Sequence, residues 1–476
     1  MAIQTAEGLI AAFDQSPLNR RYWTIFGLLA IGSVLDYFDF FIVGYLVAQL
    51  GPEWHLTYGQ SSVMLLAAGL GAIVAALTWG ALSDAFGRKR MVVSGYLICA
   101  LGAGSIALVP DGNWQLFAVL RFAVGFGLAA ASVPSLTLIV EFTPTRHRTI
   151  VSGLMVIFAT VGTLAASIMG ATLYTTLGWR MVAALGVAPA IVAVFVWLYV
   201  PESVRWLVAK ARFEEARRIV ARHLGRPIAD VPLPPIALRN ESRNEPRASL
   251  GELFAHPRFV LLVVVAMGGA ATVDYAVILW GPTILSLLLK TTVEQAARWF
   301  VAVIGCGIAG KVLFSFLPHY IGRRRAGQLH GFGLAIGIAL TGALHGEFIG
   351  GVPLFVILLM ATNIFMQGGF CNLAPYTIEI FGVRLGGRAS GLNQASNGLG
   401  KILGPLSLAL IAGSNRMLTP HATEDAILPA FLFLSLCAIG IGLAFTFLGP
   451  ETHGKPLAMA DDEPAPPIRA AAPSRI

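Results

Sequence analysis

Three acidic and three basic residues stand inside long apolar stretches of this sequence. Asp36 and Asp39 lie in "LDYFDFFIVGYL" (35–46), and the others are Arg121, Asp274, Lys311 and Lys401. A charged side chain at the centre of a bilayer costs on the order of 2.5–3.5 kcal/mol on insertion scales, so such residues usually face a cavity or a partner. Three charges of each sign could also pair with one another.

The acidic pair has the spacing of one helical turn. Asp36 and Asp39 are three residues apart, which places both carboxyl groups on one face of a helix. Two close carboxyl groups in a low-dielectric environment cannot easily both ionise, whereas a nearby arginine favours the ionised form. Such a group can change its protonation when an arginine partner moves away. The alternative is a buried ion pair that only orients helices.

A polar stripe recurs near the C-terminal end of the chain. Asn393, Asn397 and Lys401 are spaced four residues apart, which aligns them on one helix face. A stripe that ends in a cation near the middle of the membrane suits a substrate carboxylate or a string of hydroxyl groups. Hydrogen bonds between helices are an equally good explanation.

Four other polar residues lie within apolar stretches. The dipeptide Asp36–Tyr37 recurs as Asp274–Tyr275. Asp274 is therefore a second candidate for the wall of a substrate cavity. Gln367 and Asn372 are weaker candidates for substrate contact. Lys311 lies about two turns from the end of its stretch, so we expect its side chain to extend toward the membrane surface rather than to bind.

The chain as a whole has the composition of an integral membrane protein. It is 56% hydrophobic and 12% charged, with a mean hydropathy of +0.74, whereas soluble domains carry about 25% charged residues. A spanning helix needs about 20 mainly apolar residues. Twelve stretches qualify: 23–49, 60–83, 91–109, 114–140, 149–174, 180–200, 258–287, 297–317, 327–344, 351–374, 389–413 and 427–448. They predict an all-α integral membrane fold.

Basic residues are distributed unequally between the predicted loops. Of 33 Lys and Arg residues, 26 fall on one side of the membrane, four on the other and three inside spans. The positive-inside rule therefore predicts that both termini and the long central loop face the cytoplasm. The net charge of +8 then reflects topology and contact with anionic lipid, and we expect no nucleic-acid partner. The four cysteines have no disulfide or metal spacing, and we expect no metal and no cofactor.

The two halves of the chain repeat three loop signatures. "GALSDAFGRKR" (80–90) matches "SFLPHYIGRRR" (315–325), "EFTPTRHR" (141–148) matches "EIFGVRLGGR" (379–388), and "PESVRWL" (201–207) matches "PETHGKPL" (450–457). Such a duplication is typical of secondary transporters with a site between the halves. We predict an N-terminal six-helix bundle (1–200), a cytoplasmic loop (201–256), a C-terminal six-helix bundle (257–448) and a disordered cytoplasmic tail (449–476).

These motifs resemble those of the major facilitator superfamily along nearly the whole chain. Residues 80–89 fit its G-x-L-x-D-x-x-G-R-[KR] loop, and "RFAVGFG" (121–127) fits its R-x-x-x-G-x-G pattern. The exits at 201 and 450 are similar to those of the sugar porters, whereas the acidic pair is similar to that of proton symporters for metabolites and aromatic acids. The stretch 258–287 lacks the paired glutamines of hexose carriers, which disfavours a hexose.

The resemblance implies the major facilitator fold and assigns roles to several residues. Asp39 corresponds to the proton-coupling position, with Arg121 as its partner in a central cavity and Asp36 nearby. The loop signatures are expected to form charge networks that gate the cytoplasmic side and affect rate rather than specificity. The candidate gate residues are Gly80, Asp84, Gly87, Arg88, Lys89, Glu141, Arg148, Glu202, Arg205, Gly322, Arg323, Glu379 and Arg388.

The sequence thus predicts a secondary active transporter that works by alternating access. We expect proton-coupled uptake of a small organic acid or related metabolite by a monomer in the cell inner membrane. A sugar or polyol proton symporter is the alternative within the same fold. A membrane enzyme or a receptor is the alternative from another class, and the absence of a metal-ligand cluster or a nucleophile with a neighbouring base argues against an enzyme.

Overall fold

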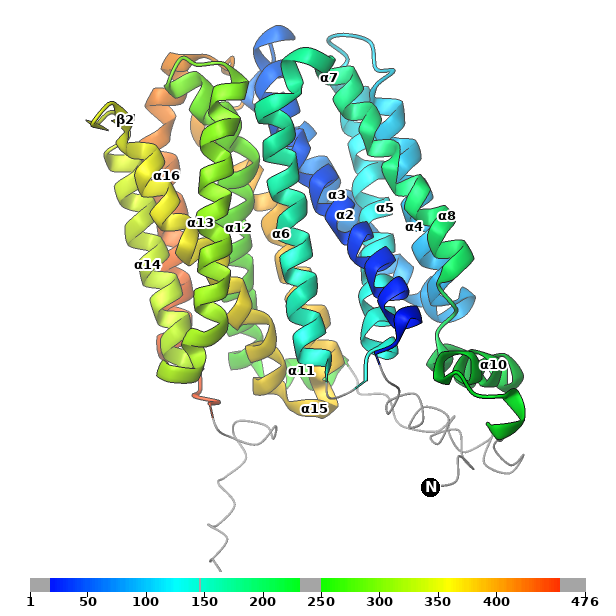
Figure 1. Cartoon of the computed structure of the whole chain (residues 1–476). Coiled ribbons are helices and arrows are strands. Elements are labelled where there is room, and N and C mark those ends of the chain that lie inside the picture. Colours follow the sequence, from blue (N-terminus) through cyan, green and yellow to red (C-terminus); the bar gives the residue numbers. More distant parts are fainter. Residues whose placement is uncertain (1–17, 145–146, 232–249, 454–476) are drawn as a thin grey trace, which may run out of the picture.

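The computed structural model describes residues 18–144, 147–231 and 250–453. In these ranges the chain is a bundle of long helices, and its strands form one hairpin, β1 (Phe348–Ile349) with β2 (Val352–Pro353). The long helices run side by side, and the short helices α10 (Phe213–Leu224) and α11 (Leu250–Phe254) lie at one end of them (Figure 1).

The N-terminal half contributes six long segments to this bundle. Five are single helices: α2 (Arg20–Glu53), α3 (Tyr58–Phe86), α4 (Arg88–Ile106), α5 (Trp114–Phe142) and α6 (Arg148–Thr172). The sixth is divided into α7 (Tyr174–Ala184), the 3₁₀ turn η2 (Leu185–Val187) and α8 (Ala188–Tyr199). The short helix α9 (Val204–Ala209), then α10 and the turn η3 (Ile228–Asp230) follow.

The C-terminal half repeats this plan after α11. Its helices are α12 (Pro257–Leu288), α13 (Val293–Ile321), α14 (Arg323–Ala343), α15 (Leu354–Ala412) and α16 (Pro420–Phe447). Gly382 has φ 73° and ψ 174°, which no helix accommodates, so α15 consists of two spans. They are Leu354–Gly382 and Arg388–Ala412.

Each of the twelve predicted stretches coincides with one of these helical segments. Ten of the described segments are long and apolar enough to cross a membrane. The other two, α4 and α14, each open with three basic residues, which lower their mean hydropathy. α4 packs against α5, and α14 packs against α16. The predicted all-α fold with twelve spans is therefore confirmed.

Side-chain caps determine where several helices begin. Asn19 accepts a hydrogen bond from the backbone N–H of Tyr22 at the start of α2. Thr57 and Gln60 form a capping box at the start of α3, in which each side chain bonds the other's backbone N–H. Such caps satisfy N–H groups that have no partner within the helix.

The two halves meet along three pairs of helices. α2 packs on α12, α3 on α15 and α6 on α13. At the first crossing, a Cβ on Gly44 would come within 2.7 Å of the Leu279 carbonyl oxygen. Only glycine lets α2 and α12 approach this closely, and the crossing lies directly beyond the acidic residues of α2.

Loops from both halves are joined at one end of the bundle, which we call the far end. The backbone N–H groups of Tyr58 and Gly59 donate to the carbonyls of Arg416 and Ser414, at 3.0 and 2.9 Å, and Leu418 N–H donates to Leu56 O at 3.2 Å. Nothing in the sequence pattern points to this contact. It holds the two halves together at the far end.

The opposite end carries the loop signatures found in the sequence, and we call it the basic end. The three basic residues that open α4 lie there, as do the three that open α14. The described chain also enters and leaves the bundle there, at Leu18 and His453.

Candidate functional site

Asp39 and Arg121 form a buried ion pair between α2 and α5. Arg121 Nη1 lies 3.0 Å from Asp39 Oδ2, and the two side chains are 1% and 5% exposed. Arg121 Nη2 also donates to the backbone carbonyl of Asp39 at 3.1 Å. Gly186 in η2 leaves room for the carboxyl group, because a Cβ there would come within 2.9 Å of Asp39 Oδ1. The structure therefore brings together the predicted acid and arginine.

Asp36 and Lys401 lie near each other but do not touch. Their charges interact, yet no ion pair between them is found in the described part of the chain. Asp36 is 6% exposed, and its Oδ1 atom has no hydrogen-bond partner there. A buried carboxyl oxygen without a hydrogen-bond partner indicates that a group from outside the described residues completes the site.

Aromatic rings surround the ammonium group of Lys401. The Nζ atom lies 4.8 Å from the ring centroid of Phe40 and 5.5 Å from that of Tyr275. The Tyr275 ring also stacks on Phe41, with centroids 5.9 Å apart and an interplanar angle of 12°. Tyr275 donates its hydroxyl hydrogen to Asn397 Oδ1 at 3.4 Å. Cation–π attraction therefore holds a positive charge in an aromatic enclosure between the halves.

Asp274 and Lys311 form a third charged unit, in the C-terminal half. Asp274 is 6% exposed and accepts a hydrogen bond from Gln367 Nε2, and its charge interacts with that of Lys311. Lys311 Nζ donates to Thr160 Oγ1 on α6 at 2.6 Å. The expectation that Lys311 extends to the membrane surface is therefore wrong, because a buried carboxylate and a hydroxyl hold it in the interface.

The predicted asparagine residues lie in different places. Asn397 joins the aromatic group through Tyr275, whereas Asn393 accepts a hydrogen bond from Thr377 at 3.4 Å. Asn372 donates to the Arg323 carbonyl at 3.0 Å, so the structure places it at the basic end and not beside Asp274. These contacts between helices match the alternative explanation for Asn393.

At the basic end of the N-terminal half, Glu202 caps helix α4. Its Oε1 atom accepts hydrogen bonds from the backbone N–H groups of Arg88 and Lys89, at 2.9 and 3.1 Å. Gly87 makes this possible, because its φ is 103° and a Cβ would lie 2.4 Å from the Glu202 carboxylate. A carboxylate at a helix N-terminus satisfies free N–H groups and complements the helix dipole.

The Arg88 side chain extends this network to α5. It pairs with Glu141 and donates to Ser203 Oγ at 3.1 Å. Ser203 in turn donates to Glu141 at 2.5 Å. Lys89 stacks over the Trp197 ring, 5.1 Å from its centroid.

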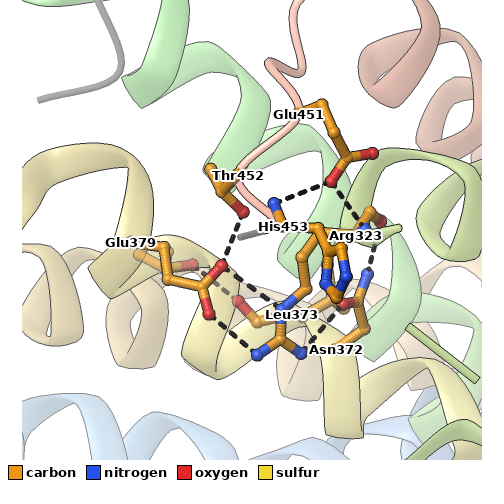
Figure 2. Close-up of polar contacts among 8 residues, drawn as sticks. Arg323, Asn372, Leu373, Glu379, Glu451, Thr452 and His453 are labelled. Carbon is orange, nitrogen blue, oxygen red and sulfur yellow. Dashed lines mark hydrogen bonds and ion pairs between the residues drawn. The ribbon is translucent and has the colours of Figure 1, made fainter. Parts of the chain in front are cut away.

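The C-terminal half repeats this network with equivalent residues (Figure 2). Glu451 accepts hydrogen bonds from the backbone N–H groups of Arg323 and Arg324, at 2.9 and 3.2 Å, beside Gly322 with φ 89°. The Arg323 side chain pairs with Glu379 at 2.8 Å, and Thr452 donates to the same carboxylate at 2.6 Å. The repeat inferred from the loop motifs thus reappears in the contacts, and each of these contacts joins residues of one half.

Some predicted gate residues lie outside these networks or outside the described side chains. The surroundings of Gly80, Asp84 and Arg148 are not among those the structure describes. Arg205 lies on the exposed side of α9, and Arg388 is exposed at the start of the second span of α15.

Sequence reasoning missed Ser203, Thr452, Glu451 and Thr160. The first three stand in the repeated exit motifs, so aligning "PES" with "PET" could have identified them. Thr160 has no such signal, because only the packing of α6 on α13 brings it to Lys311. Within the described ranges, no group of three or more His, Cys, Asp or Glu residues is placed to hold a metal ion.

Replacing Glu202 by Gln is expected to lower the maximal transport rate about tenfold. The amide loses the charge that stabilises the start of α4, an interaction worth about 1 kcal/mol or slightly more. Initial rates across a range of substrate concentrations, together with the rank order of competitors, provide the test. Glu53→Gln, at an exposed position at the far end, is the matched control. A changed rank order with an unchanged rate would contradict a gating role.

Comparison with known proteins supplies the family. The sequence profile of the Major Facilitator Superfamily matches residues 29–405. The niacin transporter NiaP of Acinetobacter baylyi is 25% identical over 457 residues, which cover 94% of this chain and 98% of that protein. The 4-hydroxybenzoate transporter PcaK of Pseudomonas putida is 30% identical over 200 residues, 42% of this chain and 44% of that protein.

The fold has a counterpart among solved structures. The crystal structure of a D-xylose-proton symporter matches with a TM-score of 0.69 and 19% identity, over 91% of this chain and 99% of that one. At this identity the likeness concerns the fold alone, whereas the family profile covers most of the chain. The chain belongs to the Major Facilitator Superfamily and is a membrane transporter.

Proposed function

We propose that the protein is a proton-coupled symporter that takes up a small aromatic monocarboxylate. The observation that carries this proposal is the position of Lys401. Its ammonium group lies over the rings of Phe40 and Tyr275, and within the described residues no carboxylate is in ion-pairing distance of it. A buried cation without a contacting anion is costly, and a substrate carboxylate would relieve that cost.

The rings around Lys401 support an aromatic substrate. Phe40, Phe41 and Tyr275 bring three ring systems together within 6 Å centroid distances. Planar rings gain from stacked or edge-on contacts with such side chains. The relatives named above transport niacin and 4-hydroxybenzoate, and each of these compounds is a planar ring that bears one carboxylate.

Proton coupling is assigned to Asp39 with Arg121. The guanidinium 3.0 Å away favours the ionised form of the carboxyl group, and this group can accept a proton when a conformational change separates the two. Asp39 would then move one proton in each transport cycle. Such transport would be driven by the proton gradient.

The proposed orientation in the membrane follows from the distribution of basic residues. The basic end carries most of the Lys and Arg residues of the loops. We therefore infer that this end and both termini face the cytoplasm, and that the protein lies in the cell inner membrane. The same proposal includes the division into two six-helix bundles, at 1–200 and 257–448, and a gating role for the two charge networks. The contact at the far end would then close the outer side.

Uptake into proteoliposomes tests the proposal. An inward proton gradient is expected to accelerate uptake of radiolabelled nicotinate or 4-hydroxybenzoate. Lys401→Gln should raise the KM about ten- to a hundredfold, because a hydrogen bond to a charged group contributes about 1.5–3 kcal/mol. Lys210→Gln, at an exposed position after α9, is the matched control.

The same assay separates the substrate classes. Unlabelled aromatic acids should compete with uptake, whereas xylose, glucose and sorbitol should not. The glutamates of both exit motifs cap α4 and α14, so these motifs carry no information about a sugar. Competition by sugars alone, or uptake that ignores the gradient, would contradict the proposal.

A further inference from the structure

We propose that Asp36 and Lys401 form a substrate-operated proton switch. In this switch the substrate carboxylate replaces Asp36 as the counter-ion of Lys401, and Asp36 takes up a proton from the solution in the same step. This inference rests on the proposed function, because it requires that a carboxylate binds at Lys401. It gives Asp36 a role separate from that of Asp39.

The pair Asp36 and Lys401 differs from the other two charged pairs in its position. Asp39 and Arg121 belong to one half and are in direct contact. Asp274 and Lys311 both belong to the other half. Asp36 lies on α2 and Lys401 on α15, so among the buried charges described here this is the pair that joins the two halves.

Lys401 packs against helices of the N-terminal half. A Cβ on Gly69 of α3 would come within 2.9 Å of the Lys401 Cβ atom, and the ammonium group reaches the Phe40 ring of α2. Phe40 stands one helical turn beyond Asp36. A carboxylate that approaches Lys401 between these rings therefore enters the field of Asp36.

The surroundings of Asp36 make its charge depend on Lys401. The charged and titratable groups that interact with it are Asp39 and Tyr37 on its own helix, Tyr96 and Cys99 on α4, and Lys401 on α15. Lys401 is the one cation in this set, since Arg121 is engaged by Asp39. A negative substrate at Lys401 cancels this cation while Asp39 still repels the Asp36 carboxylate, so Asp36 accepts a proton.

The switch has a consequence for the affinity. In the pH range where Asp36 is ionised in the absence of substrate, binding of the substrate takes up one proton. The affinity for the carboxylate should therefore fall as the pH rises, by about tenfold per pH unit in that range. Without Asp36, the affinity should not vary with pH in the same way.

Titration calorimetry on the detergent-purified full chain measures the proton directly. Nicotinate and 4-hydroxybenzoate are titrated at one pH in phosphate and in Tris, whose ionisation enthalpies differ, and the difference in heat counts protons per bound ligand. The wild type is expected to take up about one proton, and Asp36→Asn about none with binding retained. Glu53→Gln, at an exposed position at the far end, is the matched control and should still take up about one.

Every outcome decides between the alternatives. Proton uptake by Asp36→Asn equal to that of the wild type, or none by the wild type, would overturn the switch while leaving carboxylate binding intact. Absence of binding by any carboxylate would overturn the proposed function and the switch together. If Asp36→Asn does not fold, Asp36→Ser replaces it, and proton uptake by Asp36→Ser equal to that of the wild type would count against the switch.

Discussion

Asp39→Asn is expected to abolish accumulation of substrate against a gradient, with a loss of at least about a hundredfold in the proton-driven uptake ratio. Asparagine cannot carry the proton that Asp39 moves, so this step of the transport cycle no longer draws on the proton gradient. The change also leaves Arg121 buried beside a neutral amide. Breaking a buried pair by removing one partner costs about 3–5 kcal/mol, so the variant should also unfold at a lower temperature.

A second variant separates these two effects. Asp39→Asn/Arg121→Gln removes both charges and should recover part of the lost thermal stability, because no charge is left unpaired. It should not recover accumulation. Exchange of external for pre-loaded labelled substrate needs no net proton movement and should persist in Asp39→Asn. Normal accumulation by Asp39→Asn would assign the proton to another residue.

Lys311→Met is expected to reduce transport about a hundredfold. The ammonium group faces Asp274 and donates to Thr160 in the other half, so its loss leaves a buried carboxylate without a cation and breaks a link across the interface. The cost is about 3–5 kcal/mol for an uncompensated buried charge. Asp274→Asn should behave similarly, for the complementary reason.

The double variant Asp274→Asn/Lys311→Met provides the test of pairing. If the two residues act together, the double variant should be more stable and more active than either single variant. Thr160→Val keeps the charges and removes the hydroxyl, so it isolates the link between the halves. It should slow turnover about ten- to a hundredfold, because a hydrogen bond to a charged group contributes about 1.5–3 kcal/mol. Lys290→Met, at an exposed position, is the matched control. Additive losses in the double variant would contradict the pair.

Much of the fold could be predicted from the sequence because the bilayer imposes a simple rule. Every backbone N–H and C=O group in lipid must be satisfied within the segment, so an apolar stretch of sufficient length forms a helix. The duplication was visible for a related reason. Gly87 and Gly322 need a positive φ and a missing Cβ beside a glutamate, and such a geometric requirement leaves a fixed spacing in the sequence.

The site was predictable only in part. The sequence identified all six charges within the spans because they stand among apolar residues, and it selected Asp39 with Arg121 by resemblance. It misplaced Lys311, whose position near the end of a span suggested contact with the membrane surface. It could not tell that Asn372 binds the Arg323 carbonyl rather than lining the site with Gln367.

The sequence by itself thus determined how many helices cross the membrane, which residues are charged within them and which loops repeat. These properties depend on each segment and its immediate solvent. Only the tertiary structure decided which acid lies beside which base, because that depends on how α2 packs on α5, how α12 packs on α13 and how the two halves meet. Lys401 and Asp36 are 365 residues apart, and no local sequence pattern could show that the charge of one acts on the other.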